Sequence, residues 1–130
     1  MKLSIYTPEK SLLVKKSIEE ALVPSVKGEL GILPGHASLV SLLQAGVLKY
    51  KSVGASQWEK VAIGWGYLEI SKEEIKVLAE SAETKETLNR IQVEKELQEL
   101  ESQLLKWDLD PSKREELEKQ KLWLQGEKDL

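Results

Sequence analysis

The hydrophobic pattern changes its period close to residue 83, and this change constrains the fold more than any other feature of the sequence. Up to about Ala79, short apolar or alternating runs rich in Val, Ile and Tyr recur roughly every ten residues, with turn residues between them, as in a sandwich or barrel. Beyond Glu83, apolar residues follow at spacings of four, three, four and three, which is the period of one helix face: Val93, Leu97, Leu100, Leu104 and Trp107. The pattern predicts an all-β domain over residues 1–83 and an α-helical part over residues 84–130.

Charge density changes at the same place. Residues 1–83 carry ten Lys and Arg against ten Asp and Glu, whereas residues 84–130 carry nine against twelve and contain one glycine, Gly126. A dense mixture of both signs suits helices that face water. The formal net charge of −3 gives no reason to expect a nucleic-acid partner.

The C-terminal part is predicted to be an antiparallel helical hairpin. Thr84 is a plausible N-cap for the first helix, and Asp110-Pro111 supplies an N-cap and a first-turn proline for the second. The apolar residues of the second helix are Leu117, Leu122, Trp123 and Leu124. Two helices have only one narrow seam to bury, so we expect the hairpin to lean on the β-domain or on another protein.

Features of an enzyme are missing from the sequence. There is no cysteine, and the single histidine, His36, excludes a site with two histidine ligands. The glycines match neither a phosphate-binding loop nor a dinucleotide fingerprint, and no G-x-S-x-G elbow is present. We therefore expect no catalytic activity, no metal and no cofactor.

Membrane and export signals are also missing. Met1 runs directly into a strand-like segment, which leaves no room for a signal peptide, and no apolar run approaches the ~18 residues that a membrane helix needs. We expect membrane contact only through a partner.

One motif is unusually dense. Three glycines and a proline fall within Gly28-Glu29-Leu30-Gly31-Ile32-Leu33-Pro34-Gly35-His36-Ala37, where they force a specific loop path. Glu29 and His36 are its only ionisable residues. The residues alone leave two interpretations open, a structural loop with a hydrogen-bonded histidine and a binding loop.

The motif GELGILPGHASL (residues 28–39) resembles the signature loop of a known family, the epsilon subunits of bacterial and chloroplast F-type ATP synthase, which correspond to the mitochondrial delta subunit. The segments GVLKYK (46–51), VAIGWGYLEI (61–70) and IKVLAESA (75–82) resemble the family's later strands, in the same order. The resemblance extends over the whole chain, including the hairpin.

The resemblance implies a ten-stranded β-sandwich followed by two helices. It implies a non-catalytic subunit of the central rotor, which couples proton-driven rotation to ATP synthesis and contacts the gamma subunit and the ring of c subunits. Of the signature loop, Glu29 and His36 are the residues whose positions face these partners in relatives. For a bacterial chain, the implied location is peripheral, at the cytoplasmic face of the plasma membrane.

In relatives the hairpin inhibits ATP hydrolysis by extending along gamma toward the catalytic beta subunits. Basic residues of the last helix are thought to meet acidic loops there, and the candidates in this chain are Lys113, Arg114, Lys119 and Lys121. Residues 112–130 are balanced, with five positive and five negative side chains, so a merely solvated helix face stays open as an alternative.

The sequence departs from the family at the nucleotide motif I/L-D-x-x-R-A, through which some bacterial relatives bind ATP. Leu88 matches the motif, but Asn89, Gln92 and Val93 stand where Asp, Arg and Ala are expected. We therefore predict weak or no ATP binding. Ser38 replaces a usual proline and Trp65 a common glycine, which affects local loops rather than the fold.

Two other functions are compatible with the sequence. The chain could be a free-standing ligand-binding or dimerisation module whose β-domain holds a small molecule. A small hydrolase that uses His36 is a third possibility. A rotor subunit should co-purify with gamma, whereas a free-standing module should be stable alone and indifferent to gamma.

Overall fold

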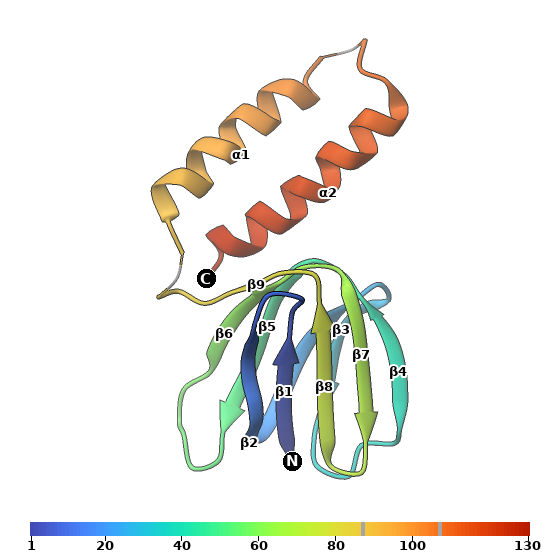
Figure 1. Cartoon of the computed structure of the whole chain (residues 1–130), viewed down its shortest axis with the longest axis vertical. Helices are drawn as coiled ribbons and strands as arrows, with labels where there is room; N and C mark the ends of the chain where they lie inside the picture. Colours follow the sequence, from blue (N-terminus) through green and yellow to red (C-terminus); the bar gives the residue numbers. More distant parts are fainter. Residues whose placement is uncertain (87, 107) are drawn as a thin grey trace.

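The computed structural model describes residues 1–86, 88–106 and 108–130. The described residues form nine strands and then two helices (Figure 1). The strands are β1 (Lys2–Tyr6), β2 (Ser11–Ser25), β3 (Gly28–Ile32), β4 (Leu39–Leu43), β5 (Gly46–Ser52), β6 (Glu59–Ile63), β7 (Gly66–Ser71), β8 (Glu74–Ala79) and β9 (Ala82–Glu83). The helices are α1 (Arg90–Leu104) and α2 (Pro111–Lys128). The predicted architecture of a β-sandwich followed by two helices is confirmed, with nine described strands in place of the expected ten.

Strand β2 joins the two layers of the sandwich. Its first half pairs with β1, and its second half pairs with β3 and β5. One layer continues from β1 through β8 and β7 to β4, and the other from β5 through β6 to β9. Lys15 has a φ of 50° within β2, where the register with β1 shifts, so the long strand bends between the layers.

The core of the β-domain consists of inward-facing residues from both layers. Leu3, Ile5, Val23, Ile32, Leu48, Ile63, Leu68, Ile75 and Val77 are all fully buried within it. The β7–β8 hairpin turns at Lys72 and Glu73, and both residues adopt a positive φ, as a two-residue hairpin turn with right-handed twist requires.

The helical hairpin has a separate core. Val93, Leu97 and Leu100 of α1 are buried against Leu117 and Leu124 of α2. Leu104 and Trp123 lie at its edge, whereas Leu122 of the predicted apolar set is 42% exposed. The prediction for Trp107 lies outside the described residues.

Local hydrogen bonds set the ends of the helices. Asp110 Oδ1 accepts a hydrogen bond from the backbone N–H of Ser112 at 2.9 Å, which confirms the predicted cap of α2. The predicted cap of α1 at Thr84 is wrong, because α1 begins only at Arg90, where Asn89 Oδ1 accepts from the N–H of Gln92 at 3.2 Å.

Candidate functional site

The signature loop is tied to the end of the β-domain that lies away from the helices (Figure 1). The N–H of Gly35, whose φ is +83°, donates to Glu73 Oε1 at 2.7 Å. The other carboxylate oxygen of Glu73 lies 3.9 Å from the N-terminal amine of Met1. The loop path is therefore fixed by the β7–β8 turn and by the first residue of the chain.

The two ionisable residues of the loop motif are not brought together. Glu29 is exposed and pairs with Pro24 beside the turn that joins β2 and β3. His36 follows β3, is half-buried, and has Nδ1 2.8 Å from the carbonyl oxygen of Ala37. Since β3 separates them, Glu29 and His36 lie at opposite ends of that strand and do not form one site.

An exposed apolar face covers the outside of β4, β7 and β8. Leu42 stands opposite Tyr67, and Tyr67 stands opposite Leu78, so the three side chains form one cross-strand row. They are 50%, 57% and 47% exposed. Val40, at 70% exposure, lies two residues from Leu42 on the same face, and Val26 extends the face beside Leu42.

This face was not predicted from the sequence. Apolar residues occupy both sides of β4 (Leu39, Val40, Leu42 and Leu43), so the strand lacks the alternation of a half-exposed strand. Apolar residues on both sides of a strand are the signal from which an exposed apolar face on β4 could have been predicted. A contiguous exposed apolar row on a folded domain marks an interaction surface.

The hairpin docks on the end of the β-domain through the last turns of α2, leaving the apolar face uncovered (Figure 1). A Cβ atom at Gly126 would lie 3.3 Å from the carbonyl oxygen of Gly46, so the helix backbone rests almost directly on the start of β5. Arg90, the first residue of α1, donates to the carbonyl oxygens of Lys128 and Leu130 at 3.0 and 2.8 Å. These bonds hold the C-terminus of the chain against α1.

The four predicted partner-binding cations all contact groups of this chain in the docked hairpin. Arg114 donates to the carbonyl oxygens of Leu104 and Lys106, both at 3.0 Å, and so closes the C-terminal end of α1. Lys119 Nζ lies 5.9 Å from the ring centre of Trp65, a contact between α2 and the β-domain. Lys121 lies 3.9 Å from Glu101 of α1, and Lys113 lies 3.9 Å from Glu116. Trp65 is thus part of the docking contact.

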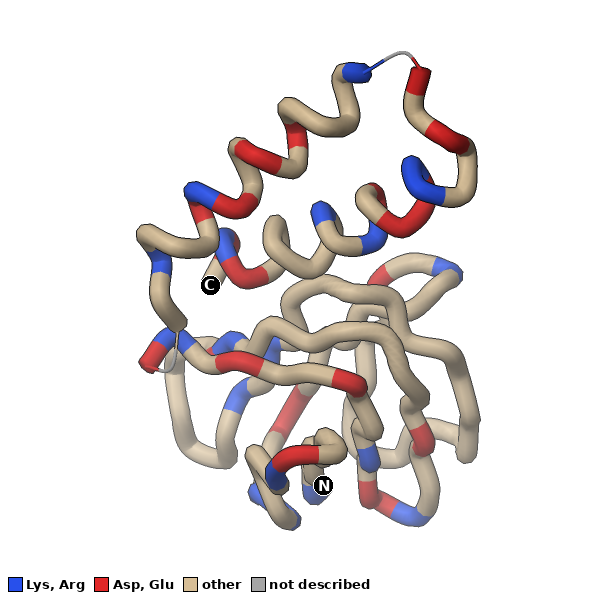
Figure 2. The backbone as a smooth tube through the Cα atoms, turned by 45° about the horizontal axis from the view of Figure 1, so that its top comes forward, with Lys and Arg blue, Asp and Glu red and all other residues tan. Residues whose placement is uncertain are grey.

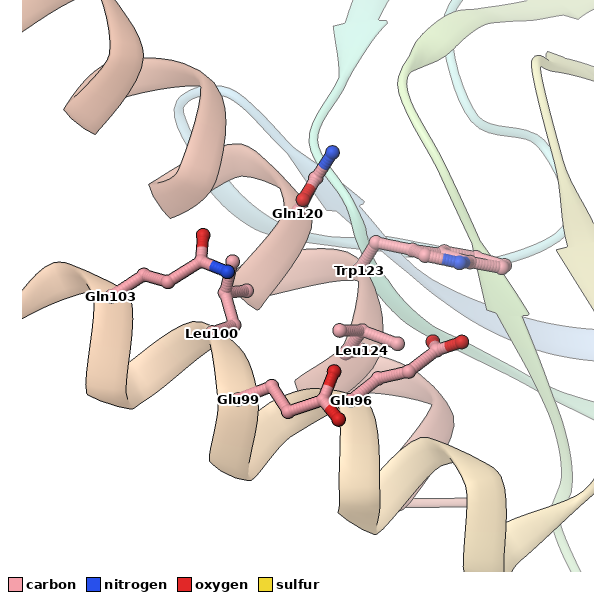
Figure 3. Close-up of a pocket in the computed structure, with 7 residues that line it drawn as sticks. All are labelled: Glu96, Glu99, Leu100, Gln103, Gln120, Trp123 and Leu124. Carbon is pink, nitrogen blue, oxygen red and sulfur yellow. The ribbon is translucent and has the colours of Figure 1, made fainter.

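Positions of positive and negative residues follow one another along the backbone of the hairpin (Figure 2). A groove of about 420 Å³ lies between the two helices. It is lined by Glu96, Glu99, Leu100 and Gln103 from α1 and by Gln120, Trp123 and Leu124 from α2 (Figure 3). With two carboxylates and no Lys or Arg among these residues, the groove is electrostatically unfavourable for phosphate groups.

The residues of the degenerate nucleotide motif serve the helix itself. Asn89 caps α1, Val93 is buried in the hairpin core, and Gln92 Nε2 donates to Glu96 at 3.2 Å.

Among residues 1–86, 88–106 and 108–130, no cluster of side chains could hold a metal ion, and no helix could cross a membrane.

Comparisons with known proteins place these features in a family. Residues 1–85 match the family model described as ATP synthase, Delta/Epsilon chain, beta-sandwich domain. The ATP synthase epsilon chain of Bdellovibrio bacteriovorus is 45% identical over 89 residues, which cover 68% of this chain and 64% of the relative. The epsilon chain of Prochlorococcus marinus is 35% identical over 80% of this chain and 75% of the relative. The match to the Bdellovibrio protein thus spans less than two thirds of that protein's length.

Two solved assemblies contain chains with the same fold. A chain of the Euglena gracilis mitochondrial ATP synthase, in a structure titled OSCP/F1/c-ring, aligns with a TM-score of 0.83 at 18% identity, covering 97% of this chain and 78% of that chain. A chain of the Tetrahymena thermophila mitochondrial ATP synthase central stalk and c-ring aligns with a TM-score of 0.64 at 12% identity, covering 99% and 94%.

Proposed function

The chain belongs to the ATP synthase delta/epsilon family, and we propose that it is a non-catalytic subunit of the central rotor of an F-type ATP synthase. In this role it couples rotation of the c-ring to ATP synthesis and lies peripherally at the membrane, at the cytoplasmic face in a bacterium. The proposal draws on the names of the relatives, and on assemblies of the central stalk and c-ring that contain chains of this fold.

The observation that carries the proposal is the exposed apolar face. Leu42, Tyr67 and Leu78 form a row that neither helix covers, and burial of such side chains contributes roughly 25 cal/mol per Å² of apolar surface. We assign this face to the gamma subunit, because the β-domain needs a firm attachment on the rotor while the hairpin occupies a different end. The opposite end, with residues 33–38 of the signature loop and thus His36, is left for the c-ring. Glu29 and His36 lie apart, so each of them needs its own partner contact.

The hairpin serves as a regulatory arm that restrains ATP hydrolysis when it leaves the β-domain. Its separate core permits such movement, because α1 and α2 bury their apolar residues mainly against each other. Lys113, Arg114, Lys119 and Lys121 would exchange their present contacts for acidic groups of the catalytic beta subunits. The acidic groove between the helices favours regulation without ATP binding to this chain.

Co-purification with the gamma subunit tests the docking role. We expect the full chain to form a 1:1 complex with gamma, and Tyr67→Asp to weaken that complex at least tenfold, since a charge would be buried in the interface. Val53→Asp is the matched control, because Val53 is 63% exposed but lies outside the apolar face. A stable dimer of the chain that ignores gamma would overturn the proposal and favour the free-standing module.

A further inference from the structure

Glu127 is a buried carboxyl group at the point where the hairpin meets the β-domain. It lies in the last turn of α2, next to Gly126, and is 8% exposed. The other two buried polar residues of the described chain are serines, and each is hydrogen-bonded: Ser4 accepts from the N–H of Lys15, and Ser25 donates to the carbonyl oxygen of Gly28. Within the described residues, no hydrogen bond or ion pair reaches the Glu127 carboxylate, and its oxygens keep a small contact with water, unlike the fully enclosed and unpaired Ser52 Oγ.

The groups that act on this carboxyl are acidic. Glu83 approaches from β9 and Glu96 from α1. Arg90 of α1 directs its guanidinium to the carbonyl oxygens of Lys128 and Leu130, and Lys128 itself is exposed. Other charged groups at this junction are Asp129, the C-cap of α2, and Glu59, Lys60, Lys85 and Glu86 around the neighbouring pocket, with Lys49 and Lys51 on β5. None of them contributes to the raised pKa of Glu127.

Burial is the largest cause of a raised pKa at Glu127, and repulsion by Glu83 and Glu96 adds to it, bringing the pKa from 4.5 to about 7. The carbonyl end of α2 also disfavours a negative charge in the last turn. Since no described side chain pairs with the carboxylate, ionisation has no compensating contact among the described residues in the docked state.

We propose that Glu127 is a proton-controlled latch, which holds the hairpin on the β-domain when protonated and loosens it when ionised. Undocking exposes the carboxyl to water and moves it away from Glu83 of β9, so the ionised form favours the released hairpin. The regulatory meaning of the latch depends on the proposed function, whereas the docking equilibrium is a property of the chain alone.

The direction of the pH effect follows from the two protonation equilibria. Docking is strongest below the pKa of the solvated carboxyl, weakens as the pH rises toward the docked pKa of about 7, and then levels off. Because one pKa unit corresponds to a tenfold change, the docking equilibrium changes by up to about 300-fold across this window.

Energy transfer between two dyes on the isolated chain tests the latch. The chain has no cysteine, so Leu105→Cys at the hairpin tip and Val53→Cys on the β-domain, at 85% and 63% exposure, allow specific labelling. We expect the docked population to fall between pH 5 and pH 7 in the labelled chain. Glu127→Gln should stay docked over the whole range, while the control Glu118→Gln, at an exposed position of α2, should keep the pH dependence.

The proposal is overturned if docking does not change over this range, or if Glu127→Gln shows the same pH dependence as the unmodified chain. Should Glu127→Gln fail to fold by circular dichroism, Glu96→Gln serves instead. It leaves Glu127 in place and should shift the transition to lower pH, and an unshifted transition would contradict the proposal. A chain that passes these tests yet fails to join the rotor would refute the proposed function and leave the latch intact.

Discussion

A larger side chain at Gly126, where α2 rests on Gly46, should raise the helix content of the chain but lower the docked population of the hairpin. In the variant Gly126→Leu, helix α2 should become more stable by about 0.7–1 kcal/mol, because glycine is among the poorest helix formers and leucine among the best. This gain applies equally to the docked and the released hairpin, so it cancels in the docking equilibrium.

The docked state itself should be strained. A Cβ at position 126 already lies 3.3 Å from the carbonyl oxygen of Gly46 and 3.4 Å from its Cα, and leucine adds three more carbon atoms. Strand β5 cannot move away easily, since it is hydrogen-bonded to β2 and β6 on its two sides. Overpacking of this kind costs about 1–3 kcal/mol, which corresponds to a loss of roughly 5- to 150-fold in docking.

Circular dichroism and the energy-transfer pair at Leu105 and Val53 measure the two effects separately. Gly126→Leu should show equal or greater helix content together with a smaller docked population, and Gly126→Ala should fall in between. Glu118→Leu introduces the same side chain on an exposed position of α2 and should leave docking unchanged. Unaltered docking in Gly126→Leu would refute the reasoning about this contact.

Three further predictions concern the hairpin. Leu100→Ala, at a position that is 5% exposed, should destabilise the hairpin by about 2–5 kcal/mol, so that thermal melting followed at a helical wavelength shifts down while the β-domain transition stays in place. Asp110→Ala should reduce helix content. Hydrogen bonds from Ser112 lower the pKa of Asp110, so the unmodified chain should lose the stability that this cap gives α2 as the pH falls through the lowered pKa. The variant should show no such acid-dependent step when helix content is followed by circular dichroism. Isothermal titration of the isolated chain with ATP should detect no micromolar binding, and a micromolar Kd would show that the acidic groove does accept phosphate.

Much of the fold follows from patterns that are local in the sequence. The period change near residue 83 and the Asp110-Pro111 start of α2 each depend on a few neighbouring residues, and the structure contains both features. Helix α1 begins later than predicted. Thr84 and Asn89 are both acceptable N-caps, and only the backbone path beyond β9 selects Asn89. The division of the chain at residue 83 into a rotor-docking domain and a regulatory domain stays a prediction.

The candidate site depends on contacts between distant segments, which a single sequence does not reveal. Nothing local to Gly126, Trp65 or Glu127 indicates that α2 rests on β5 or that a carboxyl becomes buried there. The exposed row on β4, β7 and β8 likewise requires the strand order and register. Roles assigned to Glu29, His36 and the basic residues of α2 stay predictions.

The most direct test of the account is to compare the ATP synthase complex assembled with the full chain and with a chain truncated after Glu83. The truncated chain keeps the whole β-domain core and the apolar face, so it should still join the complex stoichiometrically and support proton-coupled ATP synthesis. ATP hydrolysis by that complex should be faster, because the regulatory arm is gone. Equal hydrolysis rates in the two complexes would contradict the inhibitory role, and failure of the truncated chain to assemble would contradict the docking role of the β-domain.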